Sequence, residues 1–185
     1  IKVRFFGQFG TAPGVDDYKT MVEQGYANGV PMGGTLKAGT GAPSFTVWAT
    51  KGPREVDGNL DRIQIIKSWV DASGEPQDQV YDVVWSGVRE RDGKGKVPAV
   101  GNTVDVKTAT FTNTIGASEL KGVWTDPAFD AKQGAVYYVR VIQIPTPRWS
   151  TYDAVRAGLP LQDGVASTVQ ERAWSSPIWY TPVKN

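Results

Sequence analysis

Apolar and polar residues alternate along this chain in short runs bounded by Gly, Pro, Asn and Asp, a pattern typical of β-strands joined by turns. The clearest run is 44–50, in which Phe45, Val47 and Ala49 share one face. The pattern predicts strands over 1–6, 44–50, 62–70, 80–85, 108–115, 122–125, 135–144 and 176–180. We therefore predict a mainly β protein, an antiparallel β-sandwich of about eight strands with one short helix near the N-terminus.

That helix is expected over 15–27, where helical periodicity replaces the alternation. Asp16 and Asp17 suit its first turn because acidic side chains there cap free N–H groups and complement the helix dipole. Either Gly25 or Gly29 could end it. Its apolar side would carry Tyr18, Met21, Val22 and Tyr26. A short second helix could form near 151–157.

Two stretches fit no regular element. The first is a Gly/Pro loop that contains Pro31, Met32, Gly33 and Gly34. It lacks the lysine and spacing of phosphate-binding motifs, so we interpret it as a tight turn that approaches other chain closely. The second is 145–172, a long excursion within a single β-sandwich domain spanning 1–185; such loops are usually functional or disordered.

Composition limits the chemistry that this chain can perform. It has no histidine and no cysteine, which excludes Ser-His-Asp and Cys-His catalysis, the usual zinc sites and disulfides. Catalysis would then need carboxylates, lysine or oxygen ligands for a hard metal, and we expect no cofactor or metal site in this chain. A net charge of +1 with mixed signs argues against nucleic-acid binding, and no apolar run approaches the roughly 20 residues of a membrane span.

Seven tryptophans could pack in the core or stack on a ligand. Four fall within or beside expected strands and are interpreted as packing residues: Trp48, Trp69, Trp85 and Trp124. The other three, Trp149, Trp174 and Trp179, lie in or beside irregular chain, where packing and ligand stacking are equally expected.

Charged residues in the excursion permit two interpretations. Arg148 precedes Trp149, Tyr152 precedes Asp153, and Glu171 precedes Arg172. These residues could form an internal ion-pair network that holds the excursion, which we favour. Alternatively, Arg148, Asp153 and Glu171 could serve a self-contained enzyme.

Other charged residues are interpreted as surface features. Asp57 and Asp61 lie on either side of Gly-Asn at 58–59, and Asp126 and Asp130 lie on either side of Pro127. The first pair loosely resembles an oxygen-rich calcium loop, but the EF-hand pattern is absent, and all four are predicted to lie in solvated turns. The segment 89–96 is predicted to be a charged surface loop.

Several long motifs resemble the C-terminal part of the DUF3604 family, and the resemblance covers nearly the whole chain. The motifs are Val-Arg-Phe-Phe-Gly (3–7), Gly-Tyr-Ala-Asn-Gly-Val-Pro-Met-Gly-Gly (25–34), Asn-Leu-Asp-Arg-Ile-Gln-Ile-Ile-Lys (59–67), Val-Tyr-Asp-Val (80–83), Val-Trp-Thr-Asp-Pro (123–127), Ile-Pro-Thr-Pro-Arg-Trp (144–149) and Glu-Arg-Ala-Trp-Ser-Ser-Pro-Ile-Trp-Tyr (171–180). The family in turn resembles PHP-like metal-dependent hydrolases, whose His- and Asp-rich barrel binds divalent metals.

The resemblance implies that this chain is a non-catalytic accessory domain whose partner is its own upstream metallohydrolase domain. The divalent metal would belong to that domain. The chain opens on a strand with no initiator methionine, and we expect it to be a piece of a longer protein. The Gly/Pro loop and the excursion would then contact the hydrolase domain. Family members resemble exported bacterial proteins, which implies a periplasmic or extracellular setting. A carbohydrate-binding module that uses exposed tryptophans is the alternative.

Overall fold

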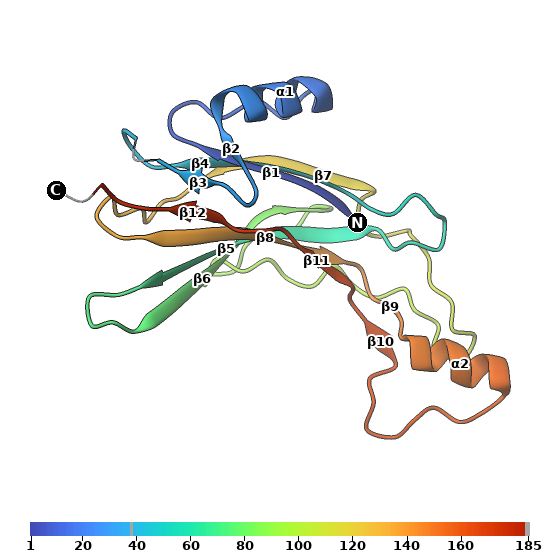
Figure 1. Cartoon of the computed structure of the whole chain (residues 1–185). Coiled ribbons are helices and arrows are strands. Elements are labelled where there is room, and N and C mark those ends of the chain that lie inside the picture. The colour runs from blue at the N-terminus through green and yellow to red at the C-terminus, as the bar shows by residue number, and fades with distance from the viewer. Residues whose placement is uncertain (38, 184–185) are drawn as a thin grey trace.

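Two β-sheets lie in layers against each other in the computed structural model, which describes residues 1–37 and 39–183 (Figure 1). The four-stranded sheet has the order β2-β1-β4-β7, with every pair antiparallel. Its strands are β1 (Lys2–Gln8), β2 (Val30–Pro31), β4 (Ser44–Thr50) and β7 (Glu119–Thr125).

The six-stranded sheet has the order β3-β12-β8-β5-β6, and β11 also pairs with β8. Its strands are β3 (Thr35–Leu36), β5 (Leu60–Val70), β6 (Pro76–Trp85), β8 (Ala135–Gln143), β11 (Arg172–Trp174) and β12 (Ile178–Tyr180). Only β3 and β12 pair in parallel. The chain is therefore mainly β and mostly antiparallel, as the alternation predicted.

One apolar core fills the space between these sheets. Phe5, Phe45 and Val47 enter it from the four-stranded sheet, and Tyr137 and Val139 enter it from β8. The rings of Phe45 and Tyr137 meet across the layers with their centroids 4.4 Å apart. Burying such large aromatic and branched side chains supplies most of the favourable free energy of folding.

The helix α1 (Tyr18–Asn28) covers part of the outer side of the four-stranded sheet. Asp17 is its N-cap, and its carboxylate accepts a hydrogen bond from the Thr20 N–H at 2.7 Å. Gly25 does not end the helix. A Cβ there would lie 2.6 Å from the ring of Phe6, so glycine allows the helix to approach the sheet. Gly29 is the C-cap.

The Gly/Pro loop is more regular than predicted, because it crosses from one sheet to the other. Its first part forms β2 on the four-stranded sheet, and its last part forms β3 on the six-stranded sheet. Between them, the Gly33 N–H donates to the Pro177 carbonyl at 2.8 Å, with Gly33 at φ +90°. The loop thus makes the close approach that its glycines indicated.

The excursion 145–172 also contains regular structure. It includes β9 (Thr146–Pro147), α2 (Trp149–Ala157) and β10 (Thr168–Val169), and β9 pairs with β10. Figure 1 shows these elements projecting away from the two sheets. The short second helix therefore exists and begins two residues before the predicted 151, after Arg148.

The strand predicted over 108–115 is wrong. This segment forms turns, with one isolated bridge between Asp105 and Thr110. Its threonines bond to one another, as in the 2.8 Å contact between the Thr108 and Thr110 hydroxyls. Such local side-chain bonds compete with a strand ladder and override the β-propensity of threonine.

Candidate functional site

The strongest candidate for a binding site is the outer face of the six-stranded sheet, the side turned away from the core. On β8 the outward residues Tyr138 and Arg140 alternate with the buried residues Tyr137, Val139 and Val141. Residues directly opposite in an antiparallel pair point to the same side. The neighbours of β8 can therefore be assigned to the outer face from the register.

This register places two exposed tryptophans on that face. Trp174 lies opposite Arg140, and Trp179 lies opposite Val136. Trp174 is 57% exposed and Trp179 is 49% exposed. Tyr138 lies between their two positions on β8. We call Trp174, Trp179, Tyr138, Arg140 and Arg172 the aromatic face.

Two arginines flank Trp174 on the aromatic face. Arg140 is directly opposite it, and Arg172 precedes it by two residues on the same side of β11, opposite Ile142. Neither guanidinium forms an ion pair within residues 1–37 and 39–183. This end of the aromatic face is therefore cationic.

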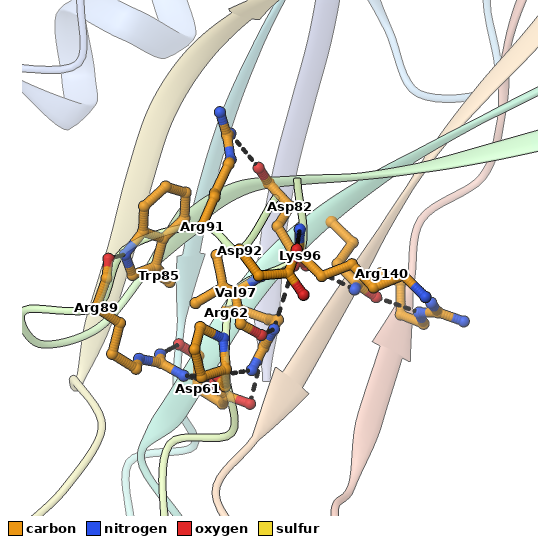
Figure 2. A network of polar contacts seen from close by, with 12 residues as sticks. Asp61, Arg62, Asp82, Trp85, Arg89, Arg91, Asp92, Lys96, Val97 and Arg140 are labelled. Atoms are coloured by element: carbon orange, nitrogen blue, oxygen red, sulfur yellow. Dashed lines mark hydrogen bonds and ion pairs between the residues drawn. The ribbon is translucent and has the colours of Figure 1, made fainter. Parts of the chain in front are cut away.

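A chain of polar contacts holds Arg140 in place (Figure 2). The Arg140 Nε–H donates to Oε1 of Gln64 at 2.7 Å, and Nε2 of Gln64 donates to Oδ1 of Asp82 at 2.7 Å. The other carboxylate oxygen of Asp82 accepts from Arg62 at 3.2 Å and from the Val97 N–H at 2.9 Å. The end of the Arg140 side chain points away from this network in Figure 2, and its Nη groups form no hydrogen bond among the described residues.

The network behind Arg140 is a buried cluster of opposite charges. Oδ2 of Asp61 lies 3.1 Å from Nε of Arg62, and Oδ1 of Asp61 lies 2.8 Å from Nη1 of Arg89. That last contact has ion-pair distance without hydrogen-bond alignment. The register of β5 against β8 skips Asp61, and such a bulge re-aims a side chain. The bulge therefore lets the Asp61 side chain reach the side chain of its sequence neighbour Arg62.

These contacts correct one sequence prediction and add to another. Asp61 is buried, not part of a solvated turn. The segment 89–96 is exposed in most of its residues, yet Arg89 turns inward to the Asp61 carbonyl and Arg91 to the Asp82 carbonyl. Strand alternation alone could not reveal this, because the bulge and the returning loop both depend on tertiary contacts.

A second buried charge pair lies between the sheets. Nζ of Lys67 donates to Oδ2 of Asp126 at 2.7 Å, and the Tyr137 hydroxyl donates to the same oxygen at 2.6 Å. Burial, and then the bond to the carboxylate, raises the pKa of Tyr137 far above its ordinary value. Asp126 is therefore a core residue, contrary to the turn prediction. The sequence signal for this buried charge pair was Lys67, which shares its side of β5 with the apolar residues Ile63 and Ile65.

Among the remaining tryptophans, the predicted packing roles are confirmed. Trp48 is buried, and Trp69, Trp85 and Trp124 are partly buried. A hollow of about 420 Å³ opens beside Trp48 and is lined by Lys2, Arg4 and Tyr18, among others. Nζ of Lys121 already lies 4.1 Å from the centre of the Trp48 ring, so this ring is occupied by an internal contact.

The remaining candidate residues do not converge on one site. Trp149, Tyr152 and Asp153 lie on α2, whereas Arg172 and Trp174 lie on β11. The ion-pair network predicted for the excursion is wrong, because none of Arg148, Asp153, Glu171 or Arg172 forms an ion pair among the described residues. Hydrogen bonds hold the excursion instead: within it the Arg148 N–H donates to the Ser167 carbonyl, and Nε2 of Gln170 ties it to the sheet by donating to the Gln143 carbonyl and to the Asp61 carboxylate.

One protein-family model matches nearly the whole chain. The model of the family described as "Protein of unknown function (DUF3604)" matches residues 1–182. The chain belongs to the DUF3604 family. No curated protein and no solved structure gives a significant match. The aromatic face and the buried networks are thus features of a chain from a family described as having unknown function.

Two further findings describe the DUF3604 chain. Neither helix of the described part has the length and apolar character needed to cross a membrane. Within the same residues, no three acidic side chains gather closely enough to hold a metal ion.

Proposed function

We propose that this chain is a non-catalytic accessory β-sandwich domain of a DUF3604 protein, and that it packs beside an upstream PHP-like metallohydrolase domain. That domain would supply the divalent metal and the chemistry. In this proposal the intact protein acts in the periplasm or outside the bacterial cell.

The excursion that projects from the sheets carries this proposal. Its helix α2 exposes Trp149, which is 68% accessible, and the segment after the helix exposes Leu159 and Leu161. Large apolar side chains exposed along a projecting segment are typical of a surface that another domain covers. The segment is held internally by the hydroxyl of the buried Thr151, which donates to the Ser167 carbonyl at 2.7 Å, and its base is tied to β8 by Gln170, which donates to the Gln143 carbonyl at 2.8 Å. A fixed apolar projection suits docking between domains.

Hydrogen exchange in the intact DUF3604 protein and in the 1–185 chain tests this proposal. We expect the amides of α2 and of 158–165 to exchange at least tenfold more slowly in the intact protein, because the second domain covers them. Replacing Trp149 and Leu159 with Ser should abolish the added protection. The matched control is Trp179→Ser, which removes an exposed tryptophan from the opposite region of the chain.

Two results would overturn the docking proposal. One is equal exchange of α2 in the two proteins. The other is an intact protein that lacks a His- and Asp-rich metal-binding region before residue 1.

A second candidate function is carbohydrate binding. It is favoured by the exposure of Trp174 and Trp179 on one face of one sheet, because exposed aromatic rings stack on the apolar faces of sugars. The docking surface and the aromatic face belong to different elements, so one chain could serve both functions.

A further inference from the structure

We infer that the aromatic face binds an acidic polysaccharide, with a uronate carboxylate on Arg140 and sugar rings stacked on Trp174 and Trp179. This inference rests on the second candidate function, carbohydrate binding, and names its ligand class. It does not depend on the docking of the hydrolase domain.

The spacing of the aromatic residues fits an extended polymer. The residues opposite Trp174 and Trp179 are four positions apart on β8, which corresponds to roughly 13 Å of strand at about 3.3 Å per residue. This distance accommodates a few linked sugar rings. Tyr138 lies between the two positions, so the polymer would meet an aromatic side chain along the whole track.

A hollow widens the track at the Trp179 end. It has a volume of about 380 Å³ and is lined by Ser68, Val70, Val136 and Trp179, among others. Small and apolar side chains dominate this lining, which suits the carbon-rich face of a pyranose more than its charged group.

Charge complementarity selects an anionic polymer. Arg140 and Arg172 flank Trp174 and form no ion pair within the described residues. The acidic residues near the track do not directly neutralise the charges of these two arginines. Asp82 accepts from Arg62, Asp78 lies at the Trp179 end beyond Ser68, and Glu171 forms no ion pair with Arg140 or Arg172 among the described residues. The carboxylate of the ligand is therefore expected at the Trp174 end.

Arg140 is oriented before any ligand arrives. Its Nε–H is held by Gln64, which is held in turn by the buried Asp82. The two Nη groups keep four N–H donors, a planar fork that can bind both oxygens of a carboxylate. Because the guanidinium is already in place, little side-chain entropy is lost on binding.

A polysaccharide is favoured over nucleic acid by the same residues. Nucleic acid binding needs a row of cations that follows the phosphates. This face has two arginines at one end, and the whole chain has a net charge of +1. Occasional carboxylates on an otherwise uncharged ring polymer match that distribution.

Isothermal titration of the 1–185 chain with polygalacturonate, an uncharged glucan and dextran sulfate tests the inference. We expect binding to polygalacturonate that Trp174→Ala and Arg140→Gln each weaken at least tenfold. Arg172→Gln should weaken it a few-fold, since this exposed guanidinium is held by no hydrogen bond in the described residues. Trp149→Ala is the matched control, because it removes an equally exposed tryptophan from α2, and it should leave the affinity unchanged.

The possible results distinguish the acidic-polysaccharide inference from the carbohydrate-binding function on which it rests. Binding of the uncharged glucan as tightly as polygalacturonate would overturn the acidic ligand and leave carbohydrate binding intact. Absence of binding to all three polymers would overturn both. Tight binding of dextran sulfate that is indifferent to Trp174→Ala would also overturn the inference, because simple charge attraction would then explain it. If Arg140→Gln unfolds the chain, Trp174→Ala and Arg172→Gln, both at exposed residues, still decide the outcome.

Discussion

Replacing Lys67 with Met should destabilise the fold more than any surface substitution, because it leaves a carboxylate buried without its cation. The side chain of Lys67 is 4% exposed and that of Asp126 is fully buried, and their charged atoms lie 2.7 Å apart. Nζ of Lys67 also donates to the Ala128 carbonyl at 2.6 Å. Methionine matches the length of lysine but supplies neither the charge nor the donors.

The magnitude follows from what remains around the carboxylate. After the substitution, Asp126 keeps two uncharged donors, the Tyr137 hydroxyl at 2.6 Å and the Ala128 N–H at 2.9 Å. Breaking one side of a buried ion pair costs about 3–5 kcal/mol, and these two donors place the cost near the lower limit. About 3 kcal/mol corresponds to a fall in Tm of roughly 6–12 °C for a domain of this size.

Urea unfolding of a double-mutant cycle measures this effect. The cycle compares wild type, Lys67→Met, Asp126→Asn and the double variant. We expect the double variant to be more stable than the sum of the two single losses predicts, because it buries no lone charge. Lys19→Met, at a lysine whose side chain is 82% exposed, is the control and should change stability little.

Two results would refute the reasoning about the buried pair. A loss of less than about 1 kcal/mol for Lys67→Met would mean that the carboxylate is not trapped in a dry environment. Simple additivity in the cycle would mean that the two side chains do not stabilise each other.

Three further predictions concern the alkaline limit, helix packing and the helix cap. The pKa of Tyr137 is raised above 10.0 in the folded state, so its contribution to stability is complete below pH 10 and is lost as the pH rises further. Between pH 10 and 11.5, wild type should therefore lose stability more steeply than Tyr137→Phe, by up to about 1.4 kcal/mol per pH unit in urea titrations; parallel slopes would contradict this. Gly25→Ala should destabilise the fold by about 1–2 kcal/mol in the same assay, because the clash with Phe6 outweighs a gain in helix propensity of about 1 kcal/mol. Gly93→Ala, where a Cβ would meet nothing, is its control, and equal effects would show that Phe6 yields freely. The bond to Thr20 lowers the pKa of Asp17, so the contribution of this cap to stability is complete above pH 3.8 and is lost as the pH falls from 3.8 through the lower folded value. Asp17→Ala should therefore flatten this acid limb of thermal unfolding, and an unchanged limb would contradict the cap.

Much of the architecture could be read from local pattern. Strand 44–50 was predicted to the residue, and the strand predicted over 135–144 is β8, which ends one residue earlier. The local pattern is enough for these features, because a strand with one buried face alternates apolar and polar residues whichever strands it pairs with. The helix start was within three residues for the same reason, since a cap is a local hydrogen bond.

The candidate site was only partly predictable. The sequence indicated Trp174, Trp179 and Arg172, because they stand beside irregular chain. It did not indicate Arg140 or Tyr138, which lie within a regular strand and gain their role only from their neighbours in the sheet. Charged residues in 145–172 suggested an ion-pair network that the fold does not form, because α2 and β11 carry them on separate elements.

The sequence by itself determined the β class of this DUF3604 chain and excluded histidine and cysteine chemistry. It left open whether Trp149, Trp174 and Trp179 are packed or exposed. The tertiary structure alone decided which charges are buried. Asp61 and Asp126 both lie within two residues of turn-forming residues, yet a bulge and a returning loop enclose the first, and Lys67 and Tyr137 from other strands enclose the second. Local sequence sets backbone preference, whereas burial depends on which distant residues arrive at the same place. The aromatic face is decided in the same way, by the register of three strands.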